Sequence, residues 1–168
     1  GMAMATYCGQ NYGAGKPERI WQGVKSSFLM MCIYVVFNFL VLWFGSRYMA
    51  LLFVAPTEVE IIEDTQLFLR ISASFFPMLG LLSILRYSIQ GVGYTALAML
   101  SGVSEMIARI LVSVLAVPAF GYIAVCFGDP TAWIAADLFL VPTFMVIYRR
   151  MKRSMSVAVP AQAGEMSK

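Results

Sequence analysis

The stretch that decides the class of this protein is SSFLMMCIYVVFNFLVLWFGS, residues 26–46. It holds 21 consecutive residues and no charged side chain. A helix of about 20 apolar residues is long enough to cross the roughly 30 Å hydrocarbon core of a lipid bilayer. Two further uncharged stretches, Tyr87–Ser104 and Ile110–Gly128, run for 18 and 19 residues. The spacing therefore predicts a chain that crosses a membrane several times.

The composition of the whole chain agrees with membrane insertion. Of its 168 residues, 60% are hydrophobic and 12% are charged, whereas a soluble domain carries about a quarter charged residues. The expected partner is a lipid bilayer, and the small net charge of +3 indicates no nucleic-acid partner. The chain has no histidine and three scattered cysteines. We therefore expect no disulfide framework, no metal site, no cofactor and no enzyme activity.

The expected fold class is all-α, a polytopic transmembrane helix bundle. Residues 1–12 are apolar, but as a helix they extend only about 18 Å. They are therefore expected to be the cytoplasmic end of a truncated helix that begins upstream. Residues 13–23 are predicted to form a loop, and residues 149–168 a cytoplasmic tail without regular structure. Full transmembrane helices are predicted over residues 24–45, 57–90, 96–119 and 131–148.

The basic residues predict which side of the membrane is cytoplasmic. Cytoplasmic loops of membrane proteins are rich in Lys and Arg. If the predicted helices alternate in direction, eight basic residues fall on one side and two on the other, and the C-terminus is cytoplasmic. The eight are Lys16, Arg19, Lys25, Arg86, Arg149, Arg150, Lys152 and Arg153, and the two are Arg47 and Arg70.

A glycine-rich stretch near the N-terminus, GQNYGAGK, does not fit a phosphate-binding loop. Gly9 lies six residues before Gly15, where that motif requires five. Pro17 stands where the motif has the Ser or Thr that holds magnesium, and no strand is predicted before it. The sequence therefore predicts no nucleotide site here.

The same stretch resembles a cytoplasmic loop of the multidrug and toxic compound extrusion (MATE) transporters. GQNYGAGKPERI, residues 9–20, leads out of one membrane helix into the next with basic residues behind it. Three further resemblances follow in the order that the family has them. They are LRYSIQGVGYT at residues 85–95, SGVSEMIARILVS at residues 101–113, and the run at residues 133–153.

This resemblance implies that residues 1–12 finish the eighth helix of a twelve-helix antiporter. The four full spans would be its ninth to twelfth helices, part of the C-terminal lobe, and the missing N-terminal lobe would be their partner. Members of the family export cationic or amphipathic small molecules across the plasma (inner) membrane in exchange for Na⁺ or H⁺. Two lobes alternate access to a central cavity, as in other secondary transporters.

Two alternatives to drug export stay open from the sequence. One is a lipid-linked oligosaccharide flippase of the same superfamily, which would be expected to line its cavity with more cationic residues. The other is a non-transporting structural membrane subunit, which a gene beginning near Met2 or Met4 would favour. The substrate, the coupling ion and the oligomeric state do not follow from the residues.

Glu105 and Arg109 are the first candidates for ion coupling. They lie four residues apart, on one face of the predicted helix 96–119. Their positions, about 14 Å and about 20 Å along that helix, are near the middle of the bilayer, where an unpaired charge costs at least about 2.5–3.5 kcal/mol. One interpretation is a role in ion coupling or gating. The other, which the pairing itself favours, is an ion pair that fixes helix packing, since a carboxylate beside Arg stays ionised.

Asp137, in the predicted helix 131–148, is the third candidate. It either approaches Arg109 and completes a network of three charges, or it reaches water at the membrane interface. Some MATE members carry a membrane-embedded Asp in the tenth helix. This chain departs from them, because no acid lies between Arg70 and Arg86. The resemblance therefore leaves the coupling ion open.

Polar side chains within the predicted spans are candidates for lining a substrate cavity. Such groups more often hydrogen-bond within or between helices. We take three of them as substrate-cavity candidates, namely Asn38, Ser83 and Gln90.

Overall fold

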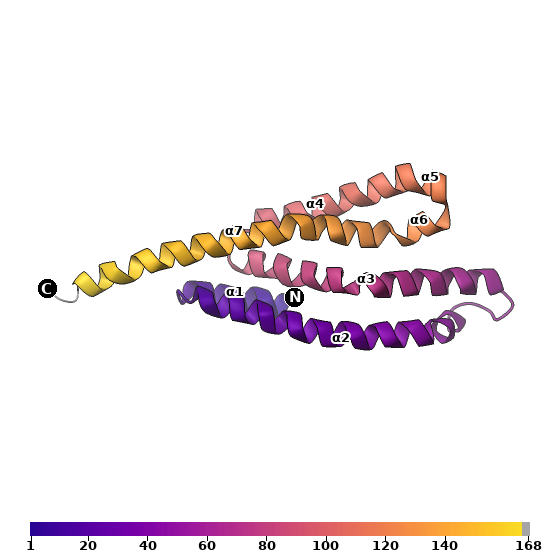
Figure 1. Cartoon of the computed structure of the whole chain (residues 1–168), viewed down its shortest axis with the longest axis horizontal. Helices are drawn as coiled ribbons and strands as arrows, with labels where there is room; N and C mark the ends of the chain where they lie inside the picture. The colour runs from indigo at the N-terminus through magenta and orange to yellow at the C-terminus, as the bar shows by residue number, and fades with distance from the viewer. Residues whose placement is uncertain (166–168) are drawn as a thin grey trace.

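In the computed structural model, which describes the backbone of residues 1–165 and the side chains of residues 1–154, the chain forms a bundle of helices (Figure 1). No strand occurs within these residues. The elements are α1 (Met2–Gly13), α2 (Pro17–Leu51), α3 (Val59–Gly91), α4 (Thr95–Leu111), the π-helical turn η1 (Val112–Ala116), α5 (Val117–Phe120), α6 (Tyr122–Cys126) and α7 (Gly128–Glu165).

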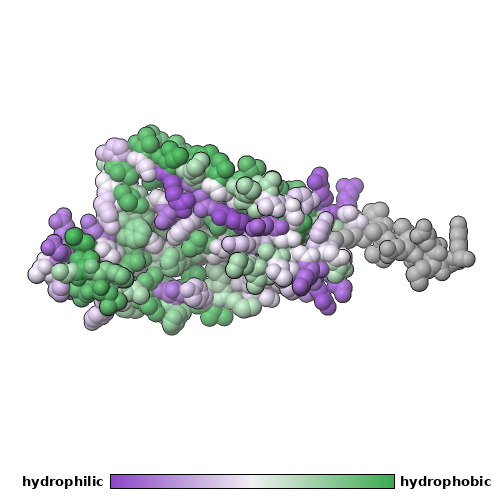
Figure 2. All heavy atoms as spheres, turned by 180° about the vertical axis from the view of Figure 1, so that it is seen from behind, coloured by the Kyte–Doolittle hydropathy of each residue, from purple (hydrophilic) through white to green (hydrophobic). Residues whose placement is uncertain are grey.

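Four segments are long and apolar enough to cross a membrane, which confirms the predicted all-α membrane bundle. They are Pro17–Leu51, Val59–Gly91, Thr95–Phe120 and Tyr122–Ser154. Their surfaces are largely hydrophobic on the face drawn in Figure 2. Phe44 and Leu138, for example, are 75% and 73% exposed. So many exposed large apolar side chains along the same helices indicate that lipid, rather than water, surrounds them.

The helices are longer than the spans predicted from hydrophobicity. Most of the predicted loop 13–23 is helical, because only Ala14–Lys16 separate α1 from α2. Gly15 supplies the left-handed turn there with φ 67°, and Pro17 suits the first turn of α2, where its missing N–H costs nothing. Likewise α7 continues to Glu165, where a tail without structure was expected. Hydropathy marks only the part of a helix that lies in lipid, so polar turns outside it are missed.

The helix α3 is the centre of the bundle. It contacts α1 and α2 on one side and α4 and α7 on the other, and α4 packs against α7. Figure 1 shows α3 lying between these two groups. The helix continues through Pro77, a residue that membrane helices tolerate when neighbours satisfy the freed carbonyl. Any charged group on the α4 side of α3 therefore faces the interior of the protein.

The pairing of α1 with α3 depends on glycine. A Cβ on Gly91 would overlap the backbone of Ala5, and a Cβ on Gly9 would lie 2.9 Å from the carbonyl oxygen of Gly91. Small residues allow membrane helices to approach closely and to gain van der Waals contacts that lipid cannot match. The backbones of α1 and α3 therefore cross at Ala5, Gly9 and Gly91.

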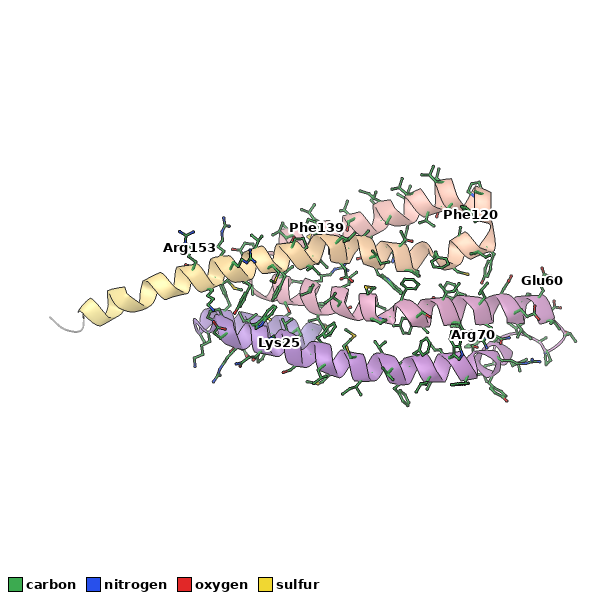
Figure 3. All side chains as sticks on the ribbon, viewed as in Figure 1. Lys25, Glu60, Arg70, Phe120, Phe139 and Arg153 are labelled. Carbon is green, nitrogen blue, oxygen red and sulfur yellow. The ribbon has the colours of Figure 1, made fainter. Side chains whose placement is uncertain are left out.

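One end of the bundle joins α2 to α7 through polar and aromatic contacts. Nζ of Lys152 lies 2.8 Å from Oε1 of Glu18, and the Tyr148 hydroxyl donates to Oε2 of Glu18 at 3.1 Å. The rings of Trp21 and Tyr148 stack with centroids 5.3 Å apart. Figure 3 shows Lys25 and Arg153 toward this end, whereas Glu60 and Arg70 lie toward the other.

The third spanning segment is not a uniform α-helix. The π-helical turn Val112–Ala116 interrupts it just before α5, whose second residue is Pro118. Proline has no N–H to donate to the carbonyl four residues earlier and its ring crowds that carbonyl, which favours a locally widened turn. Gly121, with φ 60°, then ends the segment, and α6 leads into α7 so that α7 runs antiparallel to α4.

We predict that Gly91→Ala weakens the α1–α3 contact. The added methyl group must push the two backbones apart, and such overpacking costs about 1–3 kcal/mol. The measurement is the melting temperature of the purified protein in detergent, which should fall. Gly102→Ala on α4 is the matched control, because a Cβ there meets nothing within 4 Å and alanine favours the helix. Equal melting temperatures for both variants would contradict the close crossing.

Candidate functional site

The charged side chains of the membrane helices meet between α3, α4 and α7. The carboxylate of Glu105 on α4 accepts a hydrogen bond from Nη2 of Arg86 on α3. Its second oxygen lies 3.5 Å from Nη1 of Arg109, one turn along α4. The Glu105 side chain is only 12% exposed. The predicted pair of Glu105 and Arg109 is therefore present, and Arg86 is a further partner of the same carboxylate.

A second bond fixes Arg86 against α4. Its Nε donates to the hydroxyl oxygen of Ser101 at 2.9 Å, and the Ser101 hydroxyl donates to the carbonyl oxygen of Ala98 at 2.7 Å. Ser101 is fully buried. Ser101 and Glu105 lie four residues apart, on one face of α4, so they meet the same guanidinium. Arg86 thus joins α3 to α4 through both its Nε and an Nη atom.

The outer end of this charge network is more open. Nε of Arg109 lies 2.9 Å from Oδ1 of Asp129 at the start of α7, and both side chains are 43% exposed. Figure 2 shows a hydrophilic strip crossing the otherwise mostly hydrophobic face of the half that contains α4. Exposed ion pairs contribute about 0–1 kcal/mol. The stabilisation of the network is therefore concentrated at Arg86 and Glu105.

Asp137 takes neither of the two positions considered from the sequence. Its side chain is buried, with 6% exposure, rather than in water, and Arg109 binds Asp129 instead. Within residues 1–154, neither Asp137 oxygen has a hydrogen-bond partner. The charge whose field reaches Asp137 is that of Arg86. The reason is register: α4 and α7 are antiparallel, so the pairing of residue 109 with residue 129 places residue 137 level with Ser101.

Arg86 is the site residue that sequence reasoning did not identify. Its position near the end of the predicted helix 57–90 led us to count it among the cytoplasmic basic residues. A long Arg side chain can reach several ångströms along its helix, and here it reaches inward to Glu105. The available signal was the intramembrane carboxylate of Glu105 on the next helix, since such a group attracts any nearby cation and not only Arg109.

A cavity of about 960 Å³ lies between α1, α2 and α3, away from the charge network. Of the three substrate-cavity candidates, Ser83 lines it, and the Ser83 hydroxyl also donates to the carbonyl oxygen of Leu79 at 2.9 Å. The other two lie elsewhere. The Asn38 amide donates to the carbonyl oxygen of Tyr34 at 3.0 Å, and Gln90 is exposed at the end of α3.

We predict strong coupling between Arg86 and Glu105 in a double-mutant cycle. Glu105→Leu removes the bonded carboxylate of Arg86, and Arg86→Leu leaves Glu105 with Arg109 alone. Breaking a fully buried pair costs about 3–5 kcal/mol. The cost is smaller here, because Arg86 is 26% exposed and Glu105 keeps its second arginine. The double variant should lose less than either single variant. The control pair, Arg109→Leu and Asp129→Leu, should couple by less than about 1 kcal/mol. Additive losses in thermal unfolding for Arg86 and Glu105 would show that no stabilising pair exists.

Comparison with known proteins identifies the family of the chain. A family model described as MatE matches residues 1–136, well over half of the chain. The match covers α1 to α6 and the start of α7, and it includes Arg86, Glu105 and Arg109. No curated protein and no solved structure matches the chain. The chain therefore belongs to the MatE family and is a multi-pass membrane protein of the transporter class.

Proposed function

We propose that this chain is the C-terminal part of a secondary active transporter that exports organic cations or amphipathic compounds. The driving ion is Na⁺ or H⁺, and access alternates between two lobes. The MatE match supports transport in general. The observation that carries the ion-coupled mechanism is the carboxylate of Glu105, held between two arginines inside the membrane helices.

A charge network in this position suits ion coupling for an energetic reason. Each charged group within the bilayer costs several kcal/mol unless it is paired. A change of charge at one member therefore alters which pairing is most stable, and here the pairs join α3, α4 and α7. Binding or release of an ion would in this way change the relative stability of helix arrangements, which alternating access requires.

The cavity between α1, α2 and α3 supports an amphipathic substrate. It combines the aromatic rings of Tyr7 and Tyr34 with neutral hydroxyls and flexible methionines. Aromatic faces attract organic cations, and methionine side chains adapt to ligands of different shape. We propose that this surface contributes to the substrate path, with Ser83 as its polar group on α3.

The same proposal includes the orientation in the plasma (inner) membrane. Lys25 and Arg153 lie toward one end of the bundle, and Glu60 lies toward the other (Figure 3). The positive-inside rule then makes the end with Arg153 cytoplasmic. The Lys152–Glu18 pair and the Trp21–Tyr148 stack would both face the cytoplasm.

We predict that Glu105→Gln lowers efflux of a fluorescent organic cation by about tenfold or more. The neutral amide loses charge-assisted bonds of about 1.5–3 kcal/mol, and about 1.4 kcal/mol corresponds to a factor of ten. The assay uses vesicles containing the full-length gene product at matched expression. Glu60→Gln, at an exposed position outside the network, is the control and should transport normally. Unchanged efflux in Glu105→Gln would assign Glu105 to packing alone.

The orientation predicts opposite labelling at two exposed residues. In a variant without Cys8, Cys32 and Cys126, a membrane-impermeant maleimide added to intact cells should label Thr57→Cys but not Ser154→Cys. Both positions are exposed in the structure, so permeabilised cells should show labelling of both. The reverse pattern in intact cells would place the C-terminus outside.

A further inference from the structure

Asp137 is a buried acid that the ion pairs described above do not use. It lies on α7 with 6% of its surface exposed. Both carboxylate oxygens are buried and lack a hydrogen-bond partner among residues 1–154. An ionised carboxylate without bonds in such a place is very costly, whereas a protonated carboxyl is not. The geometry therefore requires Asp137 to carry a proton or to gain a cationic partner.

Arg86 is the cation available to Asp137. It interacts electrostatically with Asp137, while its Nε is bonded to Ser101 and its Nη2 to Glu105. A guanidinium has five N–H groups, and these two bonds use two of them. Glu105 in turn has Arg109 as a second partner. Arg86 can therefore leave Glu105 without leaving that carboxylate unpaired.

The charge balance of the cluster favours one bound proton. Two arginines, Arg86 and Arg109, face three acids, Glu105, Asp129 and Asp137. With all three acids ionised the cluster carries a net charge of −1, and with Asp137 protonated it is neutral. A neutral cluster is the less costly state between membrane helices. Asp137 is the one acid of the three without a bonded arginine.

The other titratable groups around α7 lie further along it or outside the cluster. On α2, Glu18 meets α7 at Tyr148 and Lys152, about three and about four turns beyond Asp137. On α6, Tyr122 and Cys126 precede the first turn of α7, and η1 carries no titratable side chain. The titratable side chains of α3 and α4 nearest to the cluster are Arg86, Tyr87, Glu105 and Arg109.

We propose that Asp137 is a proton-binding site and that Arg86 exchanges between Glu105 and Asp137 when the proton leaves. The inference rests on the proposed ion-coupled transport and names the proton as its ion. In the protonated state Arg86 binds Glu105 and Ser101, as in this structure. On deprotonation the O–H proton of Asp137 passes to water, Arg86 breaks its bond to Glu105, and it forms one to the Asp137 carboxylate. Glu105 keeps Arg109.

The exchange accounts for the choice of a proton over Na⁺ at this position. A sodium ion at Asp137 would lie beside the positive charge of Arg86 and be repelled by it. A proton instead removes the charge that would attract Arg86. The exchange also moves a bond of α3 from α4 to α7, two helices that α3 contacts directly. Proton release is thereby converted into a change of helix pairing.

The test is a pH titration of the full chain in lipid vesicles by infrared difference spectroscopy. The signal is the carbonyl stretch of a protonated carboxyl group. We expect one such band to disappear as pH rises and to be absent from Asp137→Asn. In Glu105→Gln the freed Arg86 pairs with Asp137, so the band should disappear at a pH lower by about one unit or more. Glu60→Gln, at an exposed position outside the cluster, is the matched control, and its band should match the wild type.

Three results would overturn the site: no carboxyl band in the wild type, the same band in Asp137→Asn, or no change in the titration of Glu105→Gln. If Asp137→Asn does not fold, Arg86→Leu replaces it, and its band should persist to higher pH, since the cation is gone. If the band of Arg86→Leu disappears at the same pH as in the wild type, the result contradicts the exchange. The experiment needs no transport. If the infrared titration contradicts a proton site at Asp137 but efflux is intact, only the further inference is wrong. If the titration supports the site but no efflux is found, only the proposed function is wrong.

Discussion

The bond between Arg86 and Glu105 joins α3 to α4 in a part of the molecule where water does not replace it. An isolated charge on either helix would cost several kcal/mol between apolar surfaces, so each of these residues needs a partner of opposite charge. Ser101 adds a bond to the same guanidinium, and Arg109 extends the network to Asp129 on α7. Because α3 also carries the contacts to α1 and α2, the position of this helix relative to α4 and α7 determines how the two halves of the bundle meet.

The remaining contacts are those expected of helices in lipid. Large side chains such as Phe44 face outward, since lipid tails solvate them as well as a protein core does. Specific association then depends on close approach, as where Gly91 meets Ala5, and on polar bonds such as Lys152 to Glu18 at the end of α2. These contacts join α1 to α3, and α2 to α7 at one end of the bundle. The buried charges are the contacts that a change of protonation is able to alter.

The sequence was sufficient for the helical class, the four spans and the pair of Glu105 and Arg109, because hydropathy, length and i,i+4 spacing are local properties. It was insufficient for Arg86 and Asp137. Their roles depend on which residues of α3, α4 and α7 lie level with one another, and antiparallel register is a tertiary property. The full length of α2 was missed for a different reason: its polar first turns carry no hydropathy signal, although Pro17 marks where the helix begins.

The central claim is that Arg86 has two carboxylate partners and that protonation decides between them. Solid-state NMR of isotope-labelled protein in bilayers measures this directly, through ¹⁵N–¹³C contacts from the Arg86 guanidinium to the carboxyl carbons of Glu105 and Asp137. The predicted result is a contact to Glu105 at acidic pH that is replaced by a contact to Asp137 at alkaline pH. A contact to Glu105 that persists unchanged at every pH, with none to Asp137, would contradict the exchange and leave the network a fixed element of packing.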